Sequence, residues 1–598
     1  MDNRPHLKSG GQILVDCLIR YDVSKAFCVP GESYLPILDG LFERKGNIKL
    51  INSCHEAGAS NMAEAYGKLT GRPGVAFVTR GPGACHASVG VHIAKQDSTP
   101  MILFIGQVPS HVLGREAFQE IDYISMFSKV AKWCDQIPDA ESIEKYLNKA
   151  FEIALSGRQG PVVLALPEDV LTKQVESKNI QPIQIPKRIL SEDNLKTIKD
   201  FLSKANKPLI LLGGSGWLRE SRDGIKSFSE NNAIPVVTSF RRQDRIDNRS
   251  KSFIGTLGTS VSPKLLAAFK EADLVLVIGA RLSDMSTNHY QLFNQENTEN
   301  KLIHIYPCEN EINRVFKARI GLVADTNEVI KQLEGCFWFD RPKWLGWFER
   351  LQIEYLEDTT PSQTEDPLDL AKICNQLNDY LSKDSIITLD AGNHTGWPQR
   401  FVKFHKECLQ IGTTCGSMGY SIPAAIAASL EFPKKQVISF VGDGGFLMSG
   451  LEISTAVQNG LGIIIIVFNN SSYGTIRMHQ EFHYPNRVIG TDINPPNFVD
   501  LTEAMGGHAE KVYTTEDFCV SFEYALQSDT TILASVEKPS VSSSDEIETV
   551  ISASSPGSEL DSDTLTVIQT VIVSPLLMSP ASYVLVPSAS AEQSVKLA

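Results

Sequence analysis

Residues 437–481 read VISFVGDGGFLMSGLEISTAVQNGLGIIIIVFNNSSYGTIRMHQE. The two apolar runs in it, VISFV and IIIIVF, are typical of fully buried strands, and the stretch between them suits a helix. A strand, a glycine turn, a helix and a second strand form a right-handed crossover, so the two strands run side by side and parallel. The segment therefore predicts a parallel α/β sheet.

The same alternation of strand and helix extends outward over most of the chain. Upstream, GVAFVTRGPG, PMILFIGQ and PVVLALPEDV form one series of strand candidates, and PLILLGGSG, LVLVIGAR and KLIHIY form a second. Polar stretches separate the series. We therefore expect an α/β protein of three doubly wound parallel-sheet domains, at residues 1–175, 190–345 and 365–539.

The last segment, residues 540–598, differs in composition from the rest. It is rich in Ser and Thr, and Lys596 is its sole basic residue, yet it contains the apolar, β-prone stretch TLTVIQTVIVSPLLM. We predict no fold for it. A regulatory tail, a membrane-touching end and a shifted reading frame remain open for this segment.

Composition narrows the function classes. The 598 residues are 42% hydrophobic and 21% charged, which is typical of a globular protein, and a net charge of −14 argues against nucleic acid as a partner. No apolar stretch reaches the length of a membrane span. The eleven cysteines include no CxxC pair, which favours reduced thiols and a cytoplasmic location.

Two oxygen-bearing side chains follow the neighbouring strands of residues 437–481. Asp443 ends the first strand and Asn470 ends the second, so we expect them to converge at one edge of the sheet. Carboxylate and amide oxygens suit Mg²⁺, and a cation held by so few protein oxygens usually takes phosphate oxygens as well. The pair therefore predicts a metal site for a phosphorylated ligand.

The glycines beside Asp443 support a phosphate site. Gly442, Gly444 and Gly445 allow a tight turn and close approach to a ligand, and a helix starting near Phe446 offers free N–H groups to an anion. The segment lacks the Lys-Ser or Lys-Thr pair of a nucleoside triphosphate loop. A turn without any ligand is the alternative.

The order GDG, spacer and NN resembles the signature of the thiamine diphosphate enzymes. By this resemblance Asp443 and Asn470 are metal ligands, and the backbone carbonyl of Ser472 is the third. The implied cofactors are thiamine diphosphate and Mg²⁺. Further cofactor contacts implied by the resemblance are Asn393, His394 and Thr395 with the diphosphate, Gly416 and Met418 with the aminopyrimidine, and Gly442, Gly444, Gly445 and Tyr473 around the cofactor.

The segment SCHEAGASNMAEAYGKLTGRPGVAFVTRGPG resembles the N-terminal catalytic domain of that family, with Glu56 as the carboxylate beside the aminopyrimidine. Proton transfer there prepares thiazolium C2 to attack a 2-oxo carbon. Without the resemblance, Glu56 is simply a carboxylate favoured at a helix N-terminus. The family arrangement further implies a homodimer or homotetramer, with Glu56 of one chain reaching cofactor held by another.

FCVPGES, AFQEID, GPVVLALPEDV and GARLSD resemble the acetolactate synthase-like branch, which places Gly31, Phe118 and Gln119 on the substrate side. His479 stands where acetolactate synthases selecting larger acceptors carry tryptophan; it could act as an acid or hydrogen-bond donor, or lie on the surface. The branch often binds FAD. Arg281 matches the arginine that approaches the flavin in that branch, whereas Met285 replaces a basic residue common in its flavin-binding members. The resemblance therefore leaves FAD binding open.

We therefore expect an enzyme that decarboxylates a small pyruvate-like 2-oxo acid and joins the fragment to a second carbonyl. A simple decarboxylase, a flavin-linked oxidase and a non-catalytic cofactor-binding subunit are the alternatives. Product analysis separates ligation from protonation, and a flavin spectrum identifies the oxidase.

Overall fold

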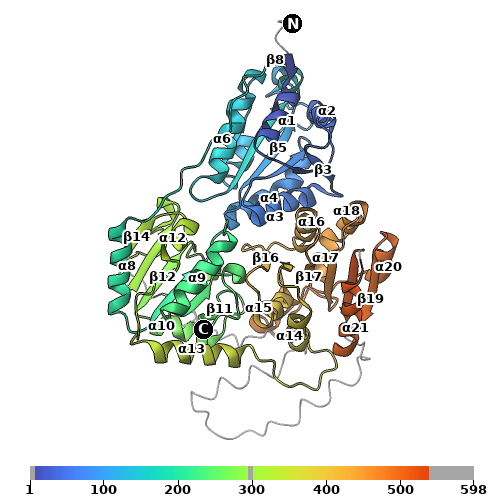
Figure 1. Ribbon diagram of the computed structural model, residues 1–598. Coiled ribbons are helices and arrows are strands. Elements are labelled where there is room, and N and C mark those ends of the chain that lie inside the picture. Colours follow the sequence, from blue (N-terminus) through green and yellow to red (C-terminus); the bar gives the residue numbers. More distant parts are fainter. Residues whose placement is uncertain (1–6, 294–300, 529, 538–598) are drawn as a thin grey trace, which may run out of the picture.

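The computed structural model describes residues 7–293, 301–528 and 530–537, and it contains three six-stranded parallel sheets, each in its own domain (Figure 1). The predicted fold class, three parallel α/β units, is confirmed. The predicted atypical tail lies outside the described residues. Among the described residues, no helix combines the length and the apolar character that crossing a bilayer requires.

The N-terminal domain is the upper, blue part of Figure 1. Its strands are β2 (Lys25–Cys28), β3 (Lys49–Asn52), β4 (Gly74–Val78), β5 (Met101–Gln107), β6 (Trp133–Gln136) and β7 (Pro161–Pro167). Its helices are α1 (Gly10–Arg20), α2 (Leu35–Glu43), α3 (Glu56–Thr70), α4 (Pro82–Asp97), α5 (Tyr123–Phe127), α6 (Ile143–Leu155) and α7 (Glu168–Thr172). A short antiparallel pair, β1 (Leu7–Ser9) with β8 (Gln174–Glu176), closes the domain.

The central domain follows after a polar connection. Its strands are β9 (Pro208–Leu212), β10 (Val236–Thr238), β11 (Phe253–Thr256), β12 (Leu274–Ile278), β13 (Leu302–Tyr306) and β14 (Ile320–Val323). Its helices are α8 (Glu192–Lys204), α9 (Arg219–Asn231), α10 (Pro263–Glu271) and α12 (Thr326–Leu333), and α13 (Leu345–Asp358) packs against β11 and α10. The buried side chains of all these elements form one core of their own.

The C-terminal domain contains residues 437–481, the segment that predicted a parallel α/β sheet. Its strands are β15 (Ile386–Leu389), β16 (Leu409–Gly412), β17 (Val437–Gly442), β18 (Ile464–Asn469), β19 (His508–Val512) and β20 (Ile532–Glu537). Its helices are α14 (Leu370–Tyr380), α15 (Gly396–Phe401), α16 (Ser421–Glu431), α17 (Asp443–Ser449), α18 (Ile453–Gln458), α19 (Gly474–His483), α20 (Phe498–Ala504) and α21 (Thr515–Leu526). As predicted, β17 and β18 are parallel neighbours.

Strand order distinguishes the central domain from the other two. The outer domains have the orders β3-β2-β4-β5-β7-β6 and β16-β15-β17-β18-β20-β19, which are the same when the strands are numbered within each domain. The central order, β11-β10-β9-β12-β13-β14, is that of dinucleotide-binding sheets. In the C-terminal domain the order reverses between β15 and β17, and ligands bind at such a point outside the carboxyl ends of the strands.

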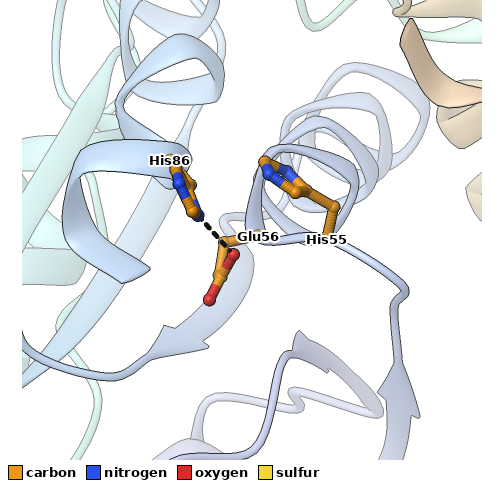
Figure 2. Close-up of side chains that lie close together, drawn as sticks. All are labelled: His55, Glu56 and His86. Atoms are coloured by element: carbon orange, nitrogen blue, oxygen red, sulfur yellow. Dashed lines mark hydrogen bonds and ion pairs between the residues drawn. The ribbon is translucent and has the colours of Figure 1, made fainter. Parts of the chain in front are cut away.

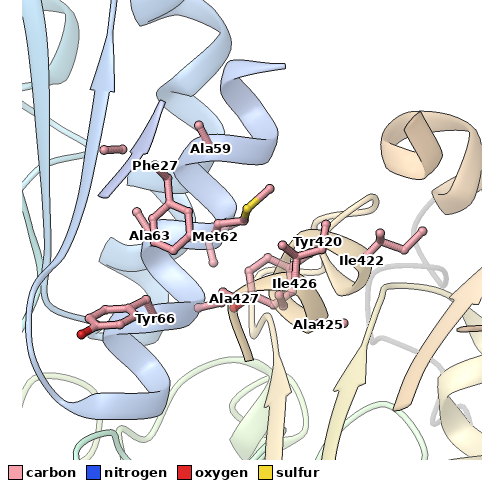
Figure 3. Close-up of a cluster of buried hydrophobic side chains, with 14 of the residues drawn as sticks. Phe27, Ala59, Met62, Ala63, Tyr66, Tyr420, Ile422, Ala425, Ile426 and Ala427 are labelled. Atoms are coloured by element: carbon pink, nitrogen blue, oxygen red, sulfur yellow. The ribbon is translucent and has the colours of Figure 1, made fainter. Parts of the chain in front are cut away.

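The N-terminal and C-terminal domains share a continuous core. Helix α3 packs along α16, and Figure 3 shows Met62 and Ala63 of α3 opposite Ile426 and Ala427 of α16. Small side chains on both helices allow this close approach. Because α3 begins at Glu56 and α16 follows the loop of Met418, this contact fixes the relative position of two segments of the candidate site.

Candidate active site

The predicted metal ligands converge. Gly442, the last residue of β17, pairs with Phe468 near the end of β18, so Asp443 and Asn470 leave the sheet side by side. The Asp443 carboxylate accepts hydrogen bonds from the backbone N–H groups of Asn470 at 3.1 Å and Ser472 at 3.2 Å. Burial raises the pKa of Asp443. Its carboxylate and the neighbouring amide oxygen are the hard donors that Mg²⁺ takes.

A cavity of about 330 Å³ opens beside these ligands, and residues between 368 and 536 supply its whole lining. The glycines form a floor that a side chain would fill: a Cβ at Gly444 would lie 2.6 Å from the Tyr473 ring and 3.2 Å from the end of Met418. Gly416 lies at the rim in the left-handed backbone region, with φ +67°. All the predicted cofactor residues except Thr395 therefore line one concave space.

His394 gives this cavity a polar group without a protein partner. The residue sits in the short 3₁₀ turn Asn393–Thr395, and its ring stacks on Phe468 with centroids 5.5 Å apart. Its Nε2 atom is buried and has no hydrogen-bond partner among the described residues. Burial and the charge of Arg241 lower the pKa of His394 to about 3, so the ring is neutral. Such an orphaned nitrogen suits a ligand oxygen, and a diphosphate would supply one.

Thr395 is the predicted cofactor contact that the structure places elsewhere. Its hydroxyl donates to the carbonyl of Gly392 and accepts from Arg241, and the residue lines a second, larger cavity rather than the first. Asn393 lines both cavities and accepts a hydrogen bond from the Thr475 hydroxyl at 3.1 Å. Thr395 therefore stabilises the Asn393–Thr395 turn without lining the cofactor cavity.

Asp390 is a site residue that the sequence analysis missed. It follows β15, it is fully buried, and its carboxylate accepts the backbone N–H groups of Gly419, Tyr420 and Ser421 at 2.9–3.1 Å. A Cβ at Gly445 would lie 2.8 Å from its Oδ1. Asp390 thus ties the Met418 loop to the turn of Asp443. An Asp at the end of a strand neighbouring β17 was the available signal.

Glu56 lies in a different place. It opens α3, and its carboxylate is 2.9 Å from Nδ1 of His86 on α4; Figure 2 shows this contact with His55 beside it. These three side chains offer possible metal-ligand atoms within 4.8 Å of one another, although Nδ1 of His55 already accepts the N–H of Ala57. Glu56 does not line the 330 Å³ cavity. Within one chain, the predicted catalytic carboxylate and the cofactor cavity are separate.

The predicted substrate-side residues lie around the turn that contacts Glu56, since a Cβ at Gly83 would lie 3.4 Å from Oε1 of Glu56 and 3.0 Å from Thr79. A Cβ at Gly31 would lie 2.5 Å from Thr79, and a Cβ at Gly81 would lie 2.8 Å from Gln119. The backbone carbonyl of Phe118 accepts a hydrogen bond from the Arg80 side chain, and 73% of the residue is exposed. These residues therefore form a second half-site around the turn between β4 and α4 of the N-terminal domain.

His479, on α19, lines the larger cavity, which has a volume of about 600 Å³. Residues of all three domains line this cavity, Gln96–Ser98 among them from the N-terminal domain. It shares five lining residues with the smaller cavity: Ala391, Gly392, Asn393, Gly416 and Thr475. The two cavities therefore share part of their walls. A molecule that reaches the cofactor cavity through the larger cavity would pass His479.

Arg281 and Met285 also line the larger cavity. Arg281 is paired with Glu311 at 3.0 Å, and Glu311 pairs with Arg158 and Arg314 as well. Burial alone would raise the pKa of Glu311, but the charges of Arg281 and Arg158 lower it. The volume suits a ligand. Glu311 balances only one of these three positive charges, so the charge at this cavity gives no argument against a flavin diphosphate.

Comparison with known proteins adds independent findings. Family models described as the N-terminal TPP binding domain, central domain and C-terminal TPP binding domain of thiamine pyrophosphate enzymes match residues 8–126, 195–333 and 390–536. Acetolactate synthase, mitochondrial, of Schizosaccharomyces pombe is 30% identical over 88% of this chain and 83% of its own length. Acetolactate synthase large subunits of Buchnera aphidicola and Lactococcus lactis are 31% and 32% identical, over 85% and 83% of this chain and 90% and 87% of theirs.

Proposed function

Because the chain belongs to the thiamine pyrophosphate enzymes, in the acetolactate synthase branch, we propose that it uses thiamine diphosphate and Mg²⁺ to decarboxylate a pyruvate-like 2-oxo acid and join the fragment to a second carbonyl. The observation that carries this proposal is the convergence of Asp443, Asn470 and Ser472 beside a glycine-floored cavity. A cytoplasmic location stays a prediction, since the Schizosaccharomyces pombe relative is named mitochondrial.

The residues of the cofactor cavity have separate roles in this proposal. Asp443, Asn470 and the backbone carbonyl of Ser472 would hold Mg²⁺, and Nε2 of His394 would serve as a hydrogen-bond donor to the diphosphate. Met418, which lines the same cavity, would support the cofactor. When bound, thiamine diphosphate supplies a nucleophilic carbon and an electron sink for decarboxylation. The protein's part is to orient the substrate, exclude water and move protons.

Glu56 is the proton-transferring group, and we propose that it serves cofactor bound by a second copy of the chain. Two observations support this. Glu56 lies outside the cofactor cavity of its own chain. Apolar side chains near both half-sites are exposed, among them Phe118 at 73% and Leu451 at 62%. A homodimer or homotetramer that covers them completes the site.

The proposal includes no flavin step and assigns no flavin to the larger cavity, where Glu311 pairs with three arginines. That cavity instead gives the second carbonyl compound a route to the cofactor, past His479. A simple decarboxylase, in which the fragment is protonated, is the alternative at this point. The nature of the product distinguishes the two outcomes.

The direct test is to incubate the chain with Mg²⁺, thiamine diphosphate, pyruvate and a panel of 2-oxo acids and aldehydes, and to identify the products by mass spectrometry. A coupled product that requires both added cofactors supports the proposal. Aldehyde as the sole product would favour simple decarboxylation. A visible spectrum with a flavin band that substrate bleaches would replace the proposal with a flavin-linked oxidase.

A further inference from the structure

Glu452 connects the metal-binding segment to the helix of Glu56. Helix α17 begins at Asp443, and the 3₁₀ turn Gly450–Glu452 follows it directly. The Glu452 side chain is buried, with 2% of the residue exposed. Its carboxylate accepts the backbone N–H of Cys54 at 3.2 Å and that of His55 at 3.1 Å. All these contacts lie within one chain.

The two N–H groups that Glu452 binds immediately precede Glu56. His55 is the N-cap of α3, and its own side chain accepts the N–H of Ala57. Free N–H groups at a helix start need acceptors, and a carboxylate there also interacts favourably with the helix dipole. Glu452 therefore supplies from another domain the anchor for the peptide that presents Glu56.

Close packing is independent evidence that Glu452 anchors the start of α3. A Cβ at Gly58 would lie 2.0 Å from Oε1 of Glu452, so this position on α3 accepts no larger residue while the carboxylate stays in place. Thr455 donates its hydroxyl to the other oxygen at 2.7 Å. The Glu452 carboxylate is thus held from both sides against the first turn of α3.

Burying a carboxylate without a cationic partner has a free-energy cost, which hydrogen bonds only partly offset. Within the part of the chain that the structure describes, the groups found around Glu452 are the Thr455 hydroxyl and the N–H groups of Cys54 and His55, with no cation among them. A different polar bridge joins the same two domains, Lys25 to Glu431 at 2.6 Å, but it is partly exposed and lies on β2 and α16. Holding the two domains together therefore does not by itself explain why a carboxylate is buried at Glu452.

We propose that Glu452 is a positioning residue that holds Glu56 in its proton-transferring position. The inference rests on the proposed function, in which Glu56 activates the cofactor. It also makes one short segment, Asp443 to Glu452, responsible for the metal at one end and for Glu56 at the other. In a site shared between two chains, that segment links the two catalytic centres.

The test uses the full-length chain with Mg²⁺ and thiamine diphosphate and compares Glu452→Gln with the wild type. The amide keeps the size of the side chain but turns an N–H donor toward one of the bound N–H groups. Hydrogen–deuterium exchange at C2 of the bound cofactor measures the step that Glu56 serves. We expect the exchange rate and kcat to fall together by about 10- to 100-fold, the scale of a small misplacement of a reacting group. Affinity for the cofactor should be unchanged.

Glu431→Gln is the matched control, because it removes an interdomain carboxylate away from α3. It should retain wild-type exchange. Gly58→Ala is the second variant; its methyl group displaces the Glu452 carboxylate and should slow exchange as Glu452→Gln does. Thermal melting of each variant, with cofactor affinity, verifies that it is folded.

Two outcomes would overturn the proposal. One is C2 exchange in Glu452→Gln equal to that in Glu431→Gln. The other is a loss of cofactor affinity in Glu452→Gln that accounts for its whole loss of rate. Glu56→Gln separates this failure from failure of the proposed function: if exchange in Glu56→Gln stays at the wild-type rate, the role of Glu56 itself is wrong.

Discussion

Replacing Asp390 with alanine should damage stability and cofactor binding together. The side chain is fully buried and accepts backbone N–H groups of Gly419, Tyr420 and Ser421. Leaving such groups without an acceptor costs roughly 1–3 kcal/mol each, and water entering the vacated space offsets part of this. We therefore expect the free energy of unfolding to fall by about 3–5 kcal/mol.

Urea denaturation of Asp390→Ala and the wild type measures the stability loss, and a fluorescence titration with thiamine diphosphate and Mg²⁺ measures affinity. Because the loop of Met418 loses its anchor, affinity should fall by at least about tenfold, or 1.4 kcal/mol. Asp390→Asn keeps one acceptor oxygen and should show a smaller loss of both. Unfolding free energy within about 1 kcal/mol of wild type, with unchanged cofactor affinity, would show that Asp390 does not anchor the Met418 loop.

Three further variants test other contacts. Lys68→Met leaves Asp97 buried without its cation, 2.5 Å away in the wild type, and should lower the free energy of unfolding in urea by about 3–5 kcal/mol. Gly444→Ala brings a methyl group within 2.6 Å of the Tyr473 ring and should destabilise the chain by roughly 1–3 kcal/mol, measured by thermal melting, and weaken cofactor binding. Glu311 has a lowered pKa when folded, so its stabilisation is present at neutral pH and is lost as pH falls below its ordinary value of 4.5. Acid titration of unfolding should therefore show the wild type losing its advantage over Glu311→Gln below that pH, and equal pH dependence of the two would contradict this.

The sequence predicted the architecture because its signals are local. Apolar runs such as VISFV and IIIIVF mark buried strands, and chirality of the crossover then brings Asp443 to Asn470. Three contacts were not predictable in this way. The Asp390 contacts depend on how two loops of the C-terminal domain meet, whereas those of Glu452 and the Arg241–Thr395 hydrogen bond depend on how separate domains meet. No spacing within one segment encodes either meeting. The separation of Glu56 from the cofactor cavity also depends on domain placement, and the family resemblance, rather than any local pattern, led us to expect it.

A mixture of two inactive variants shows whether one active site is built from two chains. Glu56→Gln lacks the proton-transferring group, and Asp443→Ala lacks a metal ligand. If the site is built from two chains, a mixed dimer contains one intact site, and an equimolar exchange of subunits should restore about a quarter of wild-type carboligation. Activity that stays at the level of the separate variants after verified subunit exchange would contradict the account.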